Sequence, residues 1–104
     1  MSVAVPPAPP PMPSFRQQPV DLVIDVRSKV EFWLGHLPEA VCHPVQTIAE
    51  TLPSLPGITT RSRILVYCAS GARSAAAAQQ LRALGYQHVV DGGPMSTAQP
   101  DYTP

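Results

Sequence analysis

The sequence predicts an α/β fold in which a small, mostly parallel sheet is covered by helices on both faces. Short apolar, β-branched runs alternate along the chain with segments of helical spacing, which is the pattern of repeated strand–helix units. The runs at residues 22–26 and 64–67 contain a single charged residue between them, as is typical of strands buried on both faces. A chain of 104 residues has room for one such domain with one modest core.

Proline divides the N-terminal part from the rest, because seven of the 14 prolines fall within residues 1–19. Proline fixes φ and has no N–H group, so this segment is expected to be extended, polyproline-like and solvated. We interpret it as a flexible tail or spacer, with a ligand for a proline-recognising module as the alternative. We therefore expect a folded domain at residues 20–97, followed by a short C-terminal tail at residues 98–104.

The first predicted unit is a strand at residues 22–26 followed by a short helix at residues 29–34. Ser28 is a plausible N-cap of this helix, and Glu31 follows it at the spacing of a capping box. Gly35 is expected to end the helix. The side chains expected to anchor the helix on the core are Phe32 and Trp33.

The remaining elements follow the same alternation. Two segments have apolar residues at three- and four-residue steps, which predicts helices, and three are short apolar runs, which predicts strands. The predicted strands are residues 40–43, 63–67 and 88–90, the predicted helices are residues 45–52 and 72–84, and a turn is expected at residues 92–94.

The loop that begins at Cys68 is the strongest candidate for a functional site. Ligands of parallel sheets bind beyond the carboxyl ends of the strands, which is where Cys68 is predicted to lie. The N–H groups of a tight loop and of the next helix make a positive, concave surface, which favours a thiolate. Gly71 lets the chain curl around an anion, and Arg73 can donate to loop carbonyls or neutralise the anion. An inert core cysteine is the alternative, but we predict that Cys68 is reactive.

The residues from Cys68 to Ser74, with Gly71 and Arg73 at their places, resemble the active-site loop of the rhodanese (sulfurtransferase) family. The similarity extends over about residues 21–96 and is closest to the small, single-domain, phage-shock-type thiosulfate sulfurtransferases. It implies a rhodanese-like α/β fold. The other motifs that resemble the family, in order, are Asp25-Val26-Arg27, Glu31-Phe32-x-x-Gly35-His36-Leu37-Pro38-x-Ala40, and Leu84-Gly85-Tyr86 with Val89 and Gly92-Gly93.

The resemblance implies a sulfurtransferase in which Cys68 is the catalytic residue. The Cys68 thiolate would take sulfane sulfur from a small donor such as thiosulfate or a persulfide, and the Cys68 persulfide would pass it to cyanide or a thiol, including a protein thiol. No metal or organic cofactor is implied. The alternative is a persulfide carrier or sulfur-relay module that does not turn over. The residues that would bind the substrate are Ala69, Ser70, Gly71, Ala72, Arg73 and Ser74.

The length of the loop argues against a cysteine phosphatase, whose similar loop has one residue more. Four residues separate Cys68 from Arg73, and the smaller ring suits a sulfur atom better than a tetrahedral phosphate. Arg73 is also the only charged residue of the loop. We therefore expect a modest affinity for thiosulfate, or a different donor.

Several residues near the motifs are expected to be structural. Arg27 is expected to pair with a nearby carboxylate and, with Asp25, to fix the edge of the site. His36 is expected to be a hydrogen-bonded turn residue. We interpret Cys42 as a core residue, although a resolving role, or a disulfide with Cys68, remains open at this point. Two positions depart from the family pattern, which has glycine and asparagine where this chain has Glu39 and His43.

The balanced net charge argues against polyanionic partners. Seven basic residues balance seven acidic ones, so neither nucleic acid nor an anionic membrane meets a strong basic field. No apolar run approaches the roughly 20 residues that span a bilayer, and no secretory signal pattern opens the chain. We expect a cytoplasmic protein that is a monomer or a weak homodimer, with Trp33 as one conceivable dimer contact.

Overall fold

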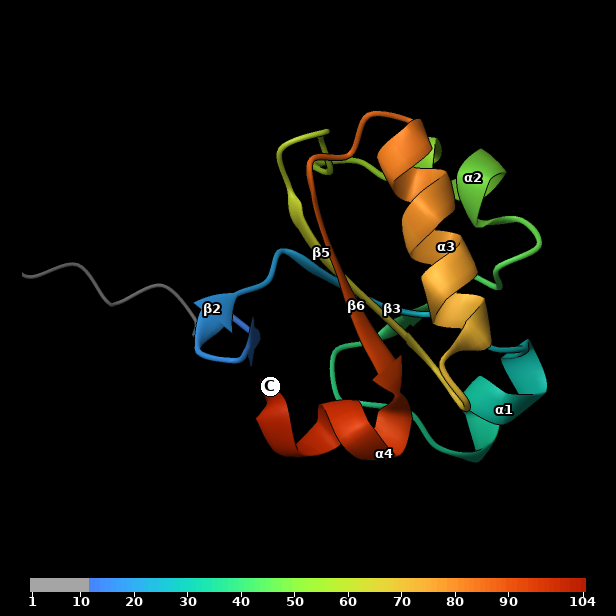
Figure 1. The fold of residues 1–104 in the computed structure, drawn as a ribbon, viewed down its shortest axis with the longest axis vertical. Helices are drawn as coiled ribbons and strands as arrows, with labels where there is room; N and C mark the ends of the chain where they lie inside the picture. Colours follow the sequence, from blue (N-terminus) through green and yellow to red (C-terminus); the bar gives the residue numbers. More distant parts are fainter. Residues whose placement is uncertain (1–11) are drawn as a thin grey trace, which may run out of the picture.

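A four-stranded parallel sheet forms the centre of the computed structural model, which describes residues 12–104 (Figure 1). The strand order is β4–β3–β5–β6, so the two strands predicted to be buried on both faces lie in the middle. The fold class predicted from the sequence is confirmed, whereas the prediction for residues 1–11 lies outside the described residues. The strands are β3 (Leu22–Asp25), β4 (Val41–Cys42), β5 (Arg63–Cys68) and β6 (His88–Pro94).

Helices cover both faces of the sheet, as expected from strand–helix alternation. The longest helix, α3, packs along β5 and β6 beside α2, and α4 packs on the opposite face (Figure 1). None of the helices within residues 12–104 combines the length and apolar character needed to cross a bilayer. The helices are α1 (Lys29–Leu34), α2 (Ile48–Thr51) with a 3-10 turn at Leu52–Ser54, α3 (Ala72–Ala83), and α4 (Met95–Ala98) with a 3-10 turn at Gln99–Asp101.

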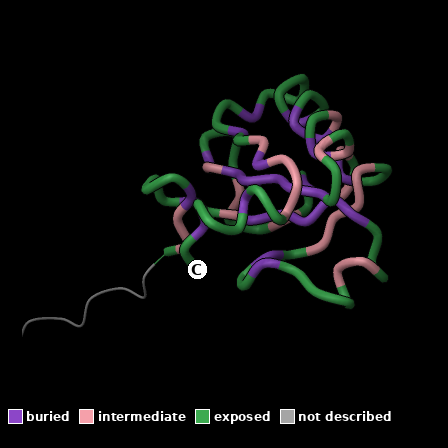
Figure 2. Tube along the Cα trace, turned by 60° about the horizontal axis from the view of Figure 1, so that its bottom comes forward, coloured by how far each residue is buried: buried purple, intermediate pink, exposed green. Residues whose placement is uncertain are grey.

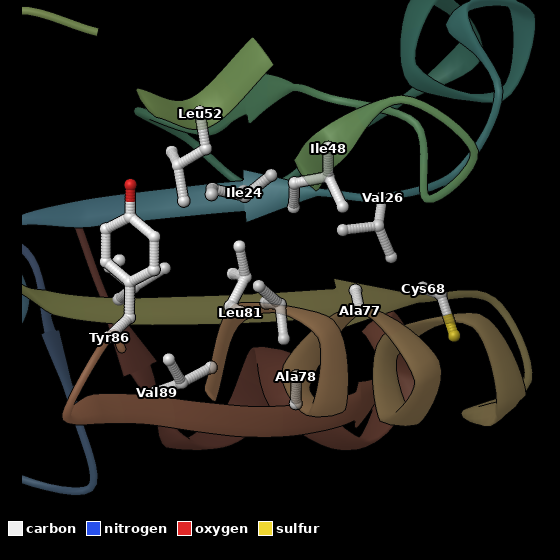
Figure 3. Close-up of a cluster of buried hydrophobic side chains, with 12 residues drawn as sticks. Ile24, Val26, Ile48, Leu52, Cys68, Ala77, Ala78, Leu81, Tyr86 and Val89 are labelled. Carbon is white, nitrogen blue, oxygen red and sulfur yellow. The ribbon is translucent and has the colours of Figure 1, made fainter. Parts of the chain in front are cut away.

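The main core lies between the sheet and the pair α2 and α3 (Figure 3). Small alanine side chains on α3 allow this helix to approach β5 closely, and larger aliphatic side chains fill the remaining space. Cys68 stands at the end of this row of core side chains, next to Ala77. The buried members of the core are Ile24, Val26, Ile48, Leu52, Ile64, Val66, Cys68, Ala77, Ala78, Leu81, Tyr86 and Val89.

The opposite face of the sheet has a second core that the sequence patterns did not reveal. A small antiparallel sheet β2–β1–β7, formed by Gln18–Pro19, Ser14–Phe15 and Tyr102–Thr103, lies against it. Phe15 and Tyr102 are buried there, although a solvated segment was expected at residues 1–19 and a tail outside the folded domain at residues 98–104. Figure 2 shows the resulting pattern, with buried segments at the centre and exposed ones along the periphery. The pairing was missed because strands of two residues carry no periodicity and join residues 87 and 89 positions apart.

Helix α1 differs from the prediction because none of its residues is buried. Phe32 is half-buried against the second core and stacks on His36, with ring centroids 3.7 Å apart. Trp33 was expected to be a second anchor, but it is 81% exposed. Consecutive residues of a helix point about 100° apart, so a helix that packs Phe32 inward turns Trp33 outward.

Two boundaries moved for reasons of tertiary contact. Helix α2 begins at Ile48 rather than at residue 45, because the N–H group of Val45 donates to the carbonyl of Val26 instead of entering a helix. Strand β6 continues through the expected glycine turn to Pro94. Gly92 permits this close course, because a Cβ atom there would lie 3.0 Å from Cδ1 of Leu65.

Helix α3 offers a test of the main core. Leu81 is completely buried and Leu84, one turn further, is 48% exposed. Replacing Leu81 with alanine should lower the free energy of unfolding by about 2–5 kcal/mol, since it leaves a cavity between α3 and the sheet. The matched Leu84→Ala variant should cost less than about 1 kcal/mol. Urea unfolding curves measure both values, and equal losses would contradict this packing.

Candidate active site

The site is built where β5 turns into α3. Cys68 is the last residue of β5 and pairs with Pro94 of β6 after an irregularity in the register. The side chain of Cys68 is completely buried, while the next two residues, Ala69 and Ser70, are exposed. The sulfur therefore lies just beneath the outer surface of the loop, and in Figure 3 it projects toward the curl of chain that starts α3.

The loop aims hydrogen-bond donors at the sulfur. Gly71 has a left-handed backbone with φ of 103°, which only glycine adopts without strain, and its N–H group lies 2.9 Å from Sγ of Cys68. The Cys68 thiol donates to Oγ of Ser74 at 3.4 Å, and the Ser74 hydroxyl donates to the carbonyl of Gly71 at 3.1 Å. Once the thiol loses its proton, the Ser74 hydroxyl can turn and donate to the sulfur.

These contacts make ionisation of the thiol easier than in water. Burial is the largest single effect and by itself would raise the pKa of Cys68. The hydroxyl of Ser74 and the backbone N–H groups of Ser74, Gly71 and Ser70 together outweigh burial, so the pKa lies below its ordinary value. The expectation that the loop favours a thiolate is thereby confirmed.

Arg73 takes a position that the sequence did not predict. Its guanidinium forms two hydrogen bonds to Glu31 of α1, at 2.7 and 3.0 Å, instead of bonds to loop carbonyls. Arg73 holds the pKa of Glu31 down at about 2. The same Glu31 carboxylate accepts from the backbone and hydroxyl of Ser28, so the predicted capping box is present. Glu31 thus belongs to the site, and its capping-box spacing gave no indication of this second partner.

A buried ion pair fixes the neighbouring end of β3. Asp25 is completely buried, and its carboxylate accepts from Nε and Nη2 of Arg27 at 2.6–3.0 Å. The same guanidinium donates to the carbonyl of Gly35, which caps α1. The structural role expected for Asp25 and Arg27 is confirmed, and this pair joins the end of β3 to the end of α1.

Cys42 lies on the other side of the sheet from Cys68. Cys42 is paired with Asp25, and Asp25 with Tyr67, so these three side chains share one face. Cys68 follows Tyr67 and therefore points to the opposite face. Both cysteines are free thiols, and burial raises the pKa of Cys42. The disulfide alternative is thus wrong for this arrangement, and the opposite faces of the two side chains argue against a resolving role for Cys42.

The histidines next to the site have structural partners. His36 bonds through Nδ1 to the carbonyl of Phe32 at 2.8 Å, which confirms its role in the turn. His43 bonds through Nδ1 to Oγ1 of Thr51 at 2.8 Å, and burial lowers the pKa of His43. Within residues 12–104, no three His, Cys, Asp or Glu side chains converge as a metal site would require.

The structure therefore gathers only part of the predicted substrate-binding set around the sulfur. Ser70, Gly71 and Ser74 supply the hydrogen bonds that lower the pKa of Cys68. Ala69 and Ala72 lie at exposed positions of the loop. Arg73 turns away from the loop carbonyls and pairs with Glu31 of α1.

Comparison with known proteins shows which family this chain resembles. The model of the rhodanese-like domain family matches residues 14–95, which include the main core, most of the second core and the complete loop. A relative from Synechocystis, itself an uncharacterized protein, is 34% identical over 95 residues, or 88% of this chain. The chain spans about half of that relative's length, namely 51%.

Two solved structures share the fold. A rhodanese from E. coli, determined with anions, is 27% identical, with a TM-score of 0.67 over 73% of this chain and 88% of its own. A human single-domain sulfurtransferase is 26% identical, with a TM-score of 0.59 over 67% of this chain and 72% of its own. Both resemble the described chain in size as well as in fold.

Variants of the two loop serines distinguish the effect of a side-chain donor on the pKa of Cys68 from the effect of a backbone donor. Replacing Ser74 with alanine removes a hydroxyl that lowers the pKa of Cys68, so the thiol should titrate at a higher pH than in the wild type. Replacing the exposed Ser70 with alanine leaves its backbone N–H group in place, so the pKa of Cys68 should hardly change. The thiolate absorbance of Cys68 against pH, in a Cys42→Ser background, measures the effect. Equal shifts in both variants would show that the Ser74 hydroxyl has no special part.

The Glu31–Arg73 pair should appear in the dependence of stability on pH. The pKa of Glu31 falls from 4.5 to about 2 on folding, so its contribution is complete above about pH 4.5 and is lost as the pH falls toward 2. Replacing Glu31 with glutamine should remove this part of the acid destabilisation. The measurement is the free energy of unfolding from pH 7 to pH 2, with Glu50→Gln on α2 as the exposed control. A Glu31→Gln curve parallel to the wild type would contradict the pairing.

Proposed function

The chain belongs to the rhodanese-like domain family, and we propose that it is a sulfurtransferase that carries sulfane sulfur as a persulfide of Cys68. The observation that carries the proposal is the sulfur of Cys68 held by loop N–H groups, with its pKa lowered in spite of complete burial. A thiolate at neutral pH is the nucleophile that this chemistry needs. The sulfurtransferase among the similar structures supports the same reaction class.

In the first step the Cys68 thiolate attacks the outer sulfur of thiosulfate. A bond forms between Sγ and that sulfur, the bond to the sulfonate sulfur breaks, and sulfite leaves with the bonding electron pair. The terminal sulfur of the persulfide carries negative charge. N–H groups such as that of Gly71 would stabilise this charge as donors of an oxyanion hole stabilise oxygen.

In the second step a nucleophile attacks the terminal sulfur, and the Sγ–S bond breaks. Cyanide leaves as thiocyanate, or a thiolate becomes a persulfide, and Cys68 returns to the thiolate. The donors that lower the pKa of Cys68 also make its thiolate a better leaving group. The same hydrogen bonds thus assist both half-reactions. Sγ is oxidised when the persulfide forms and is reduced again when the acceptor removes the outer sulfur, so the cycle needs no other oxidant or reductant.

The ion pair of Arg73 bears on the choice of donor. Arg73 is the only cation of the loop, and Glu31 already neutralises it. A thiosulfate dianion would then meet N–H groups without an unpaired positive charge from the loop. We propose that thiosulfate binds weakly and that a persulfide, which carries less charge, is the better donor. Weak capture of thiosulfate also favours the second candidate, a carrier that another protein loads.

Two free thiols suit the cytoplasm or another reducing compartment.

Mass spectrometry of the intact protein tests the proposal directly. Incubation with thiosulfate, or with a low-molecular-weight persulfide, should add one sulfur atom to the wild type and to Cys42→Ser, but not to Cys68→Ser. Cyanide should then remove the sulfur as thiocyanate. Repeated turnover identifies an enzyme, whereas a single loading and slow release identifies a carrier.

The cysteine variants also define the results that would contradict the proposed function. If neither donor adds sulfur to Cys68, or if Cys68→Ser releases thiocyanate at the wild-type rate, the proposed function is wrong. Cys42→Ser is the matched control, because Cys42 lies on the opposite face of the sheet.

A further inference from the structure

Helix α1 presents an apolar surface next to the loop that holds Cys68. Val30, Trp33 and Leu34 are 66%, 81% and 73% exposed. Their spacing of three and four residues places them on one side of the helix. Single exposed apolar side chains are ordinary, but three adjoining large ones on a six-residue helix mark an interaction surface. We call these three residues the α1 face.

Polar contacts fix the α1 face in relation to Cys68. No residue of the helix is fully buried. Besides the half-buried Phe32, the helix is held by the bond from Arg27 to Gly35 and by the pairing of Glu31 with Arg73. Leu34, three residues after Glu31, lies next to the Arg73 contact, and Trp33 lies further around the helix. Figure 1 shows α1 beside the start of α3, so the α1 face lies near the loop that holds Cys68.

The size of the α1 face favours a transient partner over a second copy of the chain. The three side chains expose on the order of 400 Å² of apolar surface, whereas a stable interface buries about 800 Å² on each partner. Lys29, four residues before Trp33, is exposed and takes part in none of the ion pairs found among residues 12–104. An acidic partner complements this lysine, while a second copy would offer another lysine.

We propose that the α1 face docks the protein whose thiol accepts sulfur from Cys68, through a segment with a cysteine, two large apolar residues and an acidic residue. This inference rests on the proposed function. The acceptor thiolate attacks the terminal sulfur of the Cys68 persulfide, a new S–S bond forms, the Sγ–S bond breaks, and Cys68 leaves as a thiolate. A helix is about 10 Å across, which three extended residues span. The cysteine should thus lie about three residues from the apolar pair.

Synthetic peptides can test the docking without a known partner. The probe is Cys-Gly-Ser-Leu-Phe-Glu, and its polar control is Cys-Gly-Ser-Ser-Gln-Lys. The measured quantity is the rate at which each peptide, or cyanide, removes sulfur from the persulfide of the wild-type protein. The probe should react about tenfold faster than the polar peptide, as expected when a contact of the hot-spot kind is made.

Exposed apolar positions supply matched variants. Trp33→Gln and Leu34→Gln should each lower the rate with the probe about tenfold and leave the rate with cyanide within about twofold. Leu84→Gln, at the far end of α3, is also half-exposed and should change neither rate. An unchanged rate with the probe in both α1 variants, or equal rates with the two peptides, would overturn the proposal.

Fluorescence separates failure of docking from failure of the sulfur chemistry. Trp33 is the only tryptophan, so its emission should shift to shorter wavelength when the probe, with serine in place of cysteine, binds Cys68→Ser. If Cys68 accepts no sulfur but this shift occurs and is lost in Leu34→Gln, the function is wrong and the docking surface stands. If dilution of the protein alone shifts the emission and halves its mass in solution, a second copy covers the face and the proposal is wrong.

Discussion

The burial of one sulfur atom is the constraint on which the rest of the structure depends. A thiolate removed from water is unfavourable unless donors replace the lost hydration. The loop supplies them from the N–H groups of Ser70, Gly71 and Ser74 and from the Ser74 hydroxyl. This requires a left-handed residue at Gly71 and the first turn of a helix immediately after it. The buried end of β5 and the start of α3 therefore act together to stabilise negative charge on the sulfur of Cys68.

Two ion pairs keep the surroundings of this loop in place. Asp25 and Arg27 lie at the carboxyl end of β3, where the carboxylate of Asp25 is completely buried. Arg27 also donates to the carbonyl of Gly35 at the end of α1. Glu31 and Arg73 are partly exposed and join α1 to the loop. Helix α1 is thus positioned by these ion pairs and by the half-buried Phe32, with no residue fully buried. This arrangement leaves one side of α1 free to serve a purpose other than packing.

The family assignment and the local chemistry support the same reading of the site. The family match spans the sheet, the loop and α1, and the donors around Cys68 explain why a sulfur nucleophile suits this position. The neutralised Arg73 distinguishes this chain from a site with a free cation for a dianionic donor. Under the proposed function, the reactivity of Cys68 would depend on hydrogen bonds, which suit a singly charged sulfur donor better than thiosulfate.

The sequence by itself determined the parallel sheet, the capping box and the loop from Cys68 to Ser74, because apolar runs, cap spacing and glycine placement act between near neighbours. The tertiary structure alone decided the partner of Arg73, which lies 42 residues away, the face occupied by Cys42, and the exposure of Trp33. It also decided the pairing of residues 14–15 with 102–103. These features arise from the pleat of the sheet, the direction of a helix face and contacts between distant segments, none of which has a local sequence signal.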